Sequence, residues 1–310
     1  MNLQQIRLFV TIAEKKNITQ AAKELFLSQP ALSRQLSLLE RELGCELLIR
    51  KNRGVELSDA GEVLYVRGTQ ILNDLNTTAE CVREANLGVQ GLVLIGTIYT
   101  CVPFLTRILK EFQKAYPNVK FRIMPDVPHR LVDDLSKGNI QLALFRAPMF
   151  EVHNFPYILF EPEQTCLAIH EDMDPCPESE EIRLEQLQDI PICFSIQDQK
   201  EYRNWDYGAL LYEECLKRKI SLKRVYECSG TVIDLMLTCS GLAASCIPQE
   251  TFHMFQCAHV HLKRFSDVNL TTQPLLIWNS DNYISRPLQL ILEYFGRRAY
   301  VPPAPERENL

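Results

Sequence analysis

The stretch Thr19–Glu40, TQAAKELFLSQPALSRQLSLLE, constrains the fold of this chain most strongly, because it predicts two short helices joined by a tight turn. Thr19 is expected to cap the first helix, since a threonine hydroxyl can accept hydrogen bonds from the free amides of a first helical turn. Ala21, Ala22 and Leu25 then give that helix an apolar side, so the pair needs an apolar partner to pack against.

The second helix is predicted to begin at Ser28, again a natural N-cap, and Pro30 favours a helix start because it lacks an amide that would have no partner there. Leu32, Leu36 and Leu39 follow at spacings of four and three, so they share one apolar face. The major groove of DNA admits a short helix whose other face is polar. That face here carries Gln29, Ser33, Arg34 and Ser37.

These two helices would also fit any helical hairpin with a solvated polar face. The detailed sequence pattern decides between that interpretation and a DNA-binding helix pair. The pattern AAxxLxxSQPALSRQLxxLExxLGxxLLxR, from Ala21 to Arg50, closely resembles the DNA-binding region of LysR-type transcriptional regulators, and the resemblance continues through the remaining length. It implies a cytoplasmic regulator that binds double-stranded promoter or operator DNA. The DNA-binding residues expected on the helix pair are Thr19, Gln29, Pro30, Ser33, Arg34 and Ser37, of which Gln29, Ser33 and Arg34 read bases.

A basic β-hairpin is predicted beside this pair. Residues 2–16 predict a helix that packs under the pair, and residues 45–58 predict the hairpin, with Arg50, Lys51 and Arg53 near its tip. A hairpin in this position is the wing of a winged helix-turn-helix, and its cations suit phosphate or minor-groove contacts. The same cluster standing alone would fit a solvated surface turn, and its place next to the helix pair favours the wing.

A long helix is predicted from Ser58 to about Gly88, roughly 45 Å in length. The resemblance implies that it is the linker through which two subunits dimerise, and that the dimers assemble into tetramers, although Gly68 and Thr78 make the apolar seam imperfect. Such a seam favours a partner helix. Its heptad-spaced and intermediate positions are Leu64, Ile71, Leu75, Thr78, Val82 and Ala85.

The remaining chain is predicted to be α/β, because short apolar strands alternate with helices. Its expected strands are 92–96, 120–124, 140–145, 166–170, 190–195, 225–228 and 272–278, and its expected helices are 104–116, 130–137, 210–219, 232–238 and 285–297. The resemblance implies a C-terminal, two-lobed, periplasmic-binding-protein-like effector domain behind an N-terminal winged helix-turn-helix rich in α-helix. The expected boundaries are 1–58 for the winged helix-turn-helix, 59–90 for the linker helix and hinge, 91–301 for the effector-binding domain (lobe I at 91–162 and 268–301, lobe II at 163–267) and 302–310 for a loose tail.

Ligands in open α/β sheets bind at the carboxyl ends of strands, where helix N-termini present free amides. In this chain that rule predicts an effector site made by Thr97, Tyr99, Thr100, Cys101, Arg146, Gln197, Tyr202, Ser229 and Thr231. Arg146 could pair with a carboxylate in bidentate fashion, so a small organic anion is the expected effector. The alternatives are that the hydroxyl groups simply cap helices and that Arg146 belongs to a surface ion pair.

The net charge of −6 divides unevenly along the chain. Residues 1–60 carry nine Lys and Arg against seven Asp and Glu, whereas the remainder carries 24 against 32. The N-terminal part can therefore bind phosphate through a few well-placed cations although the whole chain is acidic. No signal peptide is recognisable and no apolar run is long enough to span a bilayer, so no membrane partner is expected.

Eleven cysteines without a CxxC pair predict reduced thiols and not a disulfide framework. No His/Cys cluster has zinc-ligand spacing, so neither a metal nor another cofactor is expected. Cys193 and Cys215 leave a thiol redox sensor open as an alternative, since some LysR-type relatives use a cysteine pair in the second lobe. A nucleophile elbow, a P-loop and a metal motif are all missing from the sequence, so an enzyme is not expected.

Overall fold

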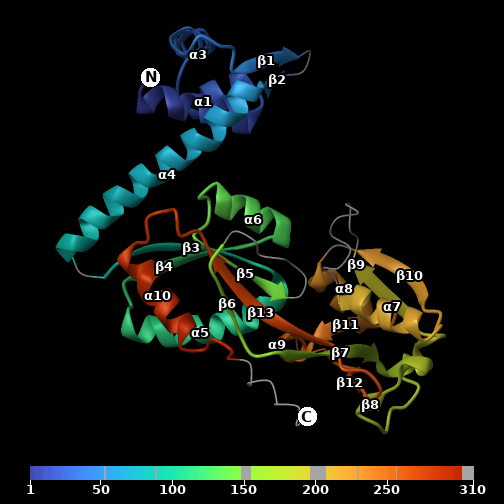
Figure 1. Ribbon diagram of the computed structural model, residues 1–310. Coiled ribbons are helices and arrows are strands. Elements are labelled where there is room, and N and C mark those ends of the chain that lie inside the picture. The colour runs from blue at the N-terminus through green and yellow to red at the C-terminus, as the bar shows by residue number, and fades with distance from the viewer. Residues whose placement is uncertain are drawn as a thin grey trace, which may run out of the picture.

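A three-helix unit with a β-hairpin, a long helix and a two-lobed α/β body follow one another along the chain in the computed structural model (Figure 1). None of the helices it describes is both long and apolar enough to cross a bilayer. The described residues are 1–51, 54–87, 89–147, 155–195, 207–228, 230–255 and 257–301.

The N-terminal unit contains the predicted helices and wing. Its helices pack their apolar sides into one core, which includes Phe9, Ile12, Ala21, Leu32 and Leu39. The two wing strands are antiparallel and lie against the end of the first helix, where the amide of Val55 donates to the carbonyl oxygen of Lys16 at 3.1 Å. The elements are α1 (Leu3–Lys15), α2 (Ile18–Glu24), α3 (Gln29–Leu43), β1 (Leu48–Lys51) and β2 (Gly54–Leu57).

The long helix α4 (Asp59–Leu87) leads away from this unit, and two of its glycines make close packing possible. A Cβ at Gly61 would lie 2.1 Å from the carbonyl oxygen of Leu47, so the start of α4 can approach the wing only without a side chain there. A Cβ at Gly68 would lie 2.9 Å from Cγ2 of Ile6, where α1 crosses α4. Gly68, which interrupts the apolar seam of α4, therefore leaves space for α1 of the DNA-binding unit.

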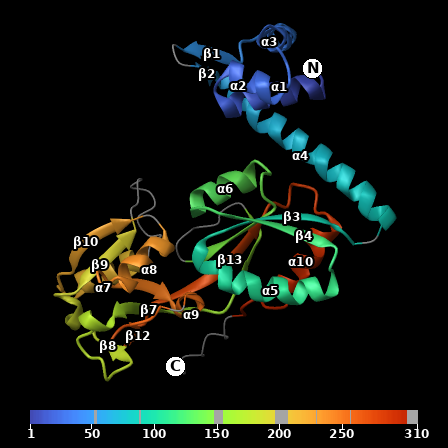
Figure 2. The same ribbon diagram turned by 180° about the vertical axis from the view of Figure 1, so that it is seen from behind.

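The helix α4 also contacts lobe I, at the turn that follows α6 (Pro128–Ser136). Gln70 Nε2 donates to the carbonyl oxygen of Ser136 at 3.3 Å, and Asn73 Nδ2 donates to that of Lys137 at 3.2 Å. Figures 1 and 2 show α6 on the side of lobe I that faces α4 and the N-terminal unit.

Lobe I is a sheet with helices on both faces. Strands β4, β3 and β5 are parallel, and β13 runs antiparallel between β5 and β6. One face packs on α5 and α10 and the other on α6, because successive strand residues such as Leu142 and Ala143 point to opposite faces. The elements are β3 (Gly91–Thr97), α5 (Val102–Ala115), β4 (Val119–Pro125), β5 (Leu142–Ala147), β6 (Tyr157–Leu159), β13 (Thr271–Trp278) and α10 (Arg286–Gly296).

Lobe II has strands at every predicted position and adds elements that were not predicted. These additions are the short strand β8, the helix α9 and the strand β12, which pairs antiparallel with β7; in lobe I, β6 was also missed. The elements of lobe II are β7 (Glu163–His170), β8 (Glu181–Ile182), β9 (Pro191–Ser195), α7 (Tyr207–Lys217), β10 (Lys223–Cys228), α8 (Thr231–Cys239), β11 (Ser245–Pro248), α9 (Gln249–Met254) and β12 (Val260–Phe265).

Two strands join the lobes. The chain leaves lobe I after β6, enters lobe II through β7, and returns from β12 into β13. At the crossing, β13 and β7 pair antiparallel, with Thr271 opposite Gln164 and Thr272 opposite Glu163. The fold is therefore an α/β body of two lobes with crossing strands, behind a winged helix-turn-helix.

Candidate nucleic-acid interface and effector site

The helix α3 presents a polar face to solvent while its apolar face is buried. Its start is defined by Ser28, whose Oγ accepts from the amide of Ala31 at 3.4 Å, and its end by Gly44, whose φ of 71° suits glycine. Leu32, Leu36 and Leu39 are buried, as their spacing predicted. Of the expected DNA-binding side chains on α3, Gln29, Pro30, Arg34 and Ser37 are exposed and Ser33 is half-buried.

The cap of α2 was predicted wrongly. Asn17 caps this helix, with its Oδ1 accepting from the amides of Thr19 at 2.9 Å and Gln20 at 3.1 Å. Thr19 therefore lies in the first turn of α2 with its side chain exposed. Its role as a helix cap is excluded, and its place on the DNA-binding face stays a prediction.

The wing lies on the same side of the N-terminal unit as α3, turned away from the two lobes (Figures 1 and 2). Lys51 is exposed at the end of β1, where its ammonium lies 3.3 Å from the carboxylate of Glu56. Arg50 occupies β1, and the position of its side chain and the whole of Arg53 lie outside the described residues. Exposed surface ion pairs of the Lys51–Glu56 kind are weak, so Lys51 can exchange this partner for a phosphate.

On the effector side, the last residue of β3 and the residues that follow the strand are mostly covered. Tyr99 is 48% exposed, whereas Thr97 and Cys101 are fully buried, and Thr97 Oγ1 donates to the carbonyl oxygen of Ile98 at 3.2 Å. Burial raises the pKa of Cys101 to about 12, so its thiol stays protonated at neutral pH. Tyr99 is the residue of this segment that can touch a ligand through its ring.

The bidentate ligand clamp predicted for Arg146 is wrong, because this side chain, 1% exposed, is part of a buried junction between the lobes. Its Nη2 lies 2.6 Å from Oε2 of Glu163 and donates to the carbonyl oxygen of Thr100 at 2.8 Å. Its Nη1 donates to Thr272 Oγ1 at 3.3 Å. The surface ion pair considered as the alternative is excluded by the same burial.

Further hydrogen bonds cross the junction around the 3-10 helix Tyr99–Cys101. The hydroxyl of Thr100 pairs with that of Tyr207, the first residue of α7, at 2.7 Å, and both groups are buried. Thr251 Oγ1 donates to the carbonyl oxygen of Thr100 at 3.0 Å. Thr100 thus joins lobe I to two helices of lobe II, α7 and α9, and its hydroxyl is not the helix cap that the alternative interpretation assumed.

On the lobe II side of the effector site, Thr231 is the first residue of α8 and is half-buried. Gly230 occupies the N-cap position with a φ of 99°, and no side chain caps the helix there. The other predicted effector residues of this lobe, Gln197, Tyr202 and Ser229, lie outside the described residues.

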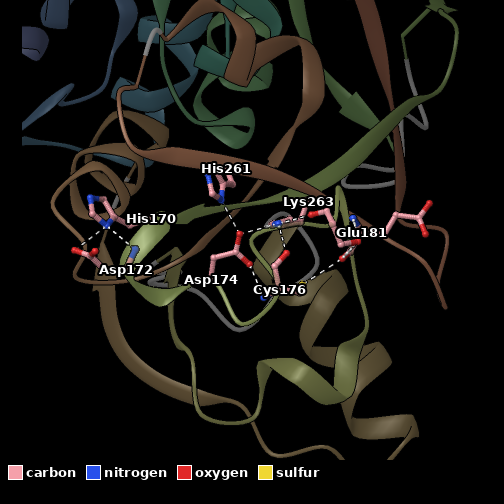
Figure 3. A network of polar contacts seen from close by, with 8 residues as sticks. His170, Asp172, Asp174, Cys176, Glu181, His261 and Lys263 are labelled. Carbon is pink, nitrogen blue, oxygen red and sulfur yellow. Dashed lines mark hydrogen bonds and ion pairs between the residues drawn. The ribbon is translucent and has the colours of Figure 1, made fainter.

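A buried network of charges fixes the outer end of lobe II (Figure 3). The carboxylate of Asp174 lies 2.7 Å from Lys263 Nζ and 2.6 Å from His261 Nδ1, and Lys263 also donates to the carbonyl oxygens of Cys176, at 2.8 Å, and Ser179. Burial alone would raise the pKa of Asp174, but the hydrogen bonds from Lys263 and His261 outweigh it and hold that pKa below its ordinary value. This network holds the loop that carries Asp174 and Cys176 against β12.

The cysteine pair considered as a redox sensor is not brought together. Cys215 is buried in α7, in the core of lobe II, and burial raises its pKa to about 11. Cys193 instead lies 3.4 Å from Cys228, sulfur to sulfur. The two belong to neighbouring parallel strands, a proximity that their sequence separation concealed.

Comparison with known proteins identifies the family. The LysR substrate binding domain matches residues 86–299, and the helix-turn-helix domain of bacterial regulatory proteins of the lysR family matches residues 3–62. The chain belongs to the LysR family.

Full-length LysR relatives align with almost the whole chain. The HTH-type transcriptional regulator BsdA of Bacillus subtilis is 27% identical over 318 residues, which cover 95% of this chain and 100% of that protein. The regulator BudR of Raoultella terrigena is 29% identical over 308 residues, again 95% and 100%. The crystal structure of full-length CbnR complexed with its target DNA has the same fold, with a TM-score of 0.75, 21% identity and coverage of 96% of this chain and 100% of that one.

As a member of the LysR family, this chain is a DNA-binding transcriptional regulator with an effector-binding domain, and it is not an enzyme. The three helices and the wing form the DNA-binding part, and the two α/β lobes form the effector-binding part. DNA and a small-molecule effector are therefore its partners.

Proposed function

We propose that this LysR-family regulator places α3 in the major groove of its operator and the wing on the neighbouring phosphates. The observation that supports this most is the division of α3 into a buried leucine face and an exposed polar face. Gln29, Ser33 and Arg34 read bases, as glutamine and arginine side chains can bind base edges in bidentate fashion. Thr19 and Ser37, both exposed, also contact the DNA, and Arg50, Lys51 and Arg53 bind its phosphate backbone.

The test compares two arginines of the same helix. Arg34→Ala removes an expected base contact, whereas Arg41→Ala removes an exposed arginine from the last turn of α3. Specific operator binding, measured by fluorescence anisotropy at fixed salt with non-specific competitor DNA, is expected to fall about 5- to 150-fold for Arg34→Ala. It is expected to change less than about threefold for Arg41→Ala. Equal losses in both variants would contradict the proposed orientation of α3.

We further propose that the apolar seam of α4 pairs with α4 of a second copy, and that two dimers assemble into a tetramer. The support is that Ile71, Leu75 and Val82 are 40%, 41% and 68% exposed in the single chain, although they share one seam. Leu75→Glu is expected to lower the molar mass measured by light scattering, and the matched control Asn76→Glu, at the exposed next position, is expected to leave it unchanged. The same mass for both variants would contradict this interface.

For the effector, we propose a small organic anion at the mouth of the junction between the lobes. The support is that α8 of lobe II contacts the 3-10 helix Tyr99–Cys101 of lobe I, that Tyr99 is exposed, and that no side chain caps the start of α8. Free amides at a helix N-terminus favour an anion. Thr231 is the described polar side chain at this start, and the proposed site also takes in Gln197, Tyr202 and Ser229. Thr97, Thr100, Cys101 and Arg146 are buried, so in this proposal they support the site and do not contact the effector.

A panel of small carboxylates and aromatic acids tests this proposal. One compound is expected to change the footprint of the wild-type protein, and Thr231→Val is expected to raise the concentration needed about tenfold, the size of a lost hydrogen bond to a charged group. Thr106→Val, at an exposed threonine of α5, is the control and should respond like wild type. If both variants respond alike, the effector does not bind at the start of α8.

A further inference from the structure

Two thiols and a carboxylate converge in lobe II, away from the DNA-binding face. The sulfur atoms of Cys193 and Cys228 are 3.4 Å apart, and Oδ1 of Asp234 lies 3.3 Å from the first and 2.6 Å from the second. All three ligand atoms lie within 4.8 Å of one another, which is close enough for one metal ion to contact them all.

Three separate elements build this cluster. Cys193 lies in β9 and Cys228 ends β10, while Asp234 belongs to the first turn of α8 (Figure 1). The cysteines are 35 residues apart in sequence, and Asp234 follows Cys228 by six, so no zinc-ligand spacing is visible in the chain. The expectation of no metal site rested on that spacing and could not detect ligands brought together by strand pairing.

The strand register favours a shared ion over a disulfide. In the parallel pair β9–β10, Cys193 is opposite Tyr226 and Cys228 is opposite Ser195, so the two cysteines are diagonal neighbours. With a strand spacing near 4.8 Å and two residues of offset, their Cα atoms are about 8 Å apart. A disulfide needs Cα atoms within about 7 Å and sulfurs at about 2.05 Å, so it would require the backbone to move.

The distances suit tetrahedral zinc better. At Zn–S distances of about 2.3 Å and Zn–O distances of about 2.0 Å, tetrahedral geometry places two sulfurs about 3.8 Å apart and a sulfur about 3.5 Å from an oxygen. The sulfur–sulfur distance of 3.4 Å and the Cys193–Asp234 distance of 3.3 Å approach these values. Cys228 has to withdraw from Asp234 by less than 1 Å, which the rotation of one side chain can supply.

The position of Asp234 is held by its own backbone. Its carbonyl oxygen lies 3.0 Å from Thr238 Oγ1 and 3.2 Å from Ser245 Oγ, and these two hydroxyl oxygens are 2.8 Å apart, so one hydroxyl donates to the carbonyl while the other donates either to it or to the first hydroxyl. This small network attaches α8 to β11 and so fixes the backbone from which the Asp234 side chain projects. The thiols are buried and Asp234 is half-buried, so an ion can enter from the side of α8.

We propose that Cys193, Cys228 and Asp234 form a Zn²⁺ site, in which the two thiols and the carboxylate bind one ion and water completes the tetrahedron. Binding displaces one proton from each thiol to solvent, with no change in oxidation state. The mixed ligand set selects zinc, since thiolates are soft and the carboxylate is hard, and zinc accepts both. A bound ion joins β9, β10 and α8, and so stiffens the lobe II side of the effector site.

The test is metal binding by the reduced, metal-free, full-length protein. Equilibrium dialysis with Zn²⁺ alone is expected to give one ion per chain, and Co²⁺ as a probe is expected to give sulfur-to-metal charge-transfer absorption in the near ultraviolet. Cys193→Ser, Cys228→Ser and the isosteric Asp234→Asn are each expected to weaken Zn²⁺ binding at least about tenfold, as lost ligand contacts do. Saturating Zn²⁺ is expected to raise the melting temperature of wild type and not of these variants.

Cys239→Ser is the matched control, because Cys239 and Cys257 form a second neighbouring thiol pair in lobe II. This variant should bind Zn²⁺ and Co²⁺ like wild type. Zinc binding that survives both Cys193→Ser and Cys228→Ser, or that is lost in Cys239→Ser, overturns the assignment. If the protein binds no Zn²⁺ and hydrogen peroxide instead links Cys193 to Cys228, as mapped by mass spectrometry, the pair is a redox site and the proposal is wrong.

Discussion

Glu163→Gln is expected to destabilise the effector-binding lobes strongly. The substitution keeps the shape of the side chain and removes the negative charge that faces Arg146 at 2.6 Å, in a pair of which Arg146 is 1% and Glu163 13% exposed. The other carboxylate oxygen accepts from the amide of Glu250 at 2.6 Å, so the new amide group must turn a donor toward either that amide or the guanidinium.

The size of the effect follows from the burial of Arg146. Leaving one member of a buried ion pair without its partner costs about 3–5 kcal/mol, and because Glu163 keeps a little solvent contact we take the lower limit, about 3 kcal/mol. For a body of roughly 200 residues, each kcal/mol shifts the melting temperature by about 2–4 °C, so the lobes should melt about 6–12 °C lower. Thermal unfolding of the full chain followed by circular dichroism measures this shift.

A second, exposed ion pair between the lobes provides the control for this prediction. Arg107 on α5 and Glu250 on α9 also pair across the lobes, at 2.8 Å, but their side chains are 55% and 42% exposed. Arg107→Gln should cost less than about 1 kcal/mol and shift the melting temperature by less than about 4 °C. Equal shifts for Glu163→Gln and Arg107→Gln would refute the reasoning that burial sets the value of the pair.

Three further predictions concern other parts of the chain. Gly61→Ala, which improves helix propensity in ordinary helices, should here lower the melting temperature of the N-terminal unit by several degrees and weaken operator binding, because the new Cβ meets the carbonyl oxygen of Leu47. Asp174→Asn should destabilise lobe II at neutral pH, since it leaves Lys263 buried without its anion. The folded pKa of Asp174 is lowered, so its stabilisation is present above the ordinary aspartate pKa and is lost as pH falls through the folded value. The difference in melting temperature between wild type and variant should therefore begin to narrow below about pH 4 and close at lower pH. Tyr207→Phe should cost about 1 kcal/mol in thermal unfolding, by removing the buried hydrogen bond to the 3-10 helix.

Local sequence patterns predicted helices and strands correctly where the buried residues recur at a regular spacing or form an apolar run. The buried leucines of α3 were predicted from their spacing, and strands β3, β5 and β13 of lobe I from short apolar runs, and the structure confirms both. The strand β12 was missed because Lys263 interrupts its apolar alternation. A lysine can occupy that buried position only because Asp174, from a loop far away in sequence, supplies its counter-ion.

The cap of α2 shows a limit of the local rules themselves. Asn17 and Thr19 are both good N-cap residues, and nothing within the helix decides between them. The structure selects Asn17, because α1 ends immediately before it with Lys16 in the left-handed conformation, at a φ of 49°. The turn between two helices, and not the second helix alone, sets where the second helix begins.

The residues of the candidate sites are brought together by pairing of strands that are distant in sequence, and local sequence patterns do not predict that pairing. The rule for strand ends placed Arg146 after the strand, whereas it lies within β5, near its end, and its partner Glu163 begins β7 in the other lobe. Only the crossing of β7 and β13 brings the two together. In the same way Cys193 was considered with Cys215, whereas the parallel pairing of β9 and β10 places it beside Cys228. The sequence identified Arg146 and Cys193 as candidate functional groups, but only the strand pairing determines which residues lie beside them.

The crossing strands also determine when each part of the protein can fold during its synthesis. In lobe I, β13 lies between β5 and β6, so the sheet lacks one of its inner strands until residues 271–278 have left the ribosome. At about 5–20 residues per second, the roughly 120 residues that separate β5 from β13 take about 6–24 s to translate. The winged helix is complete long before that time, so each new chain can present a DNA-binding surface while its sensor is still being built.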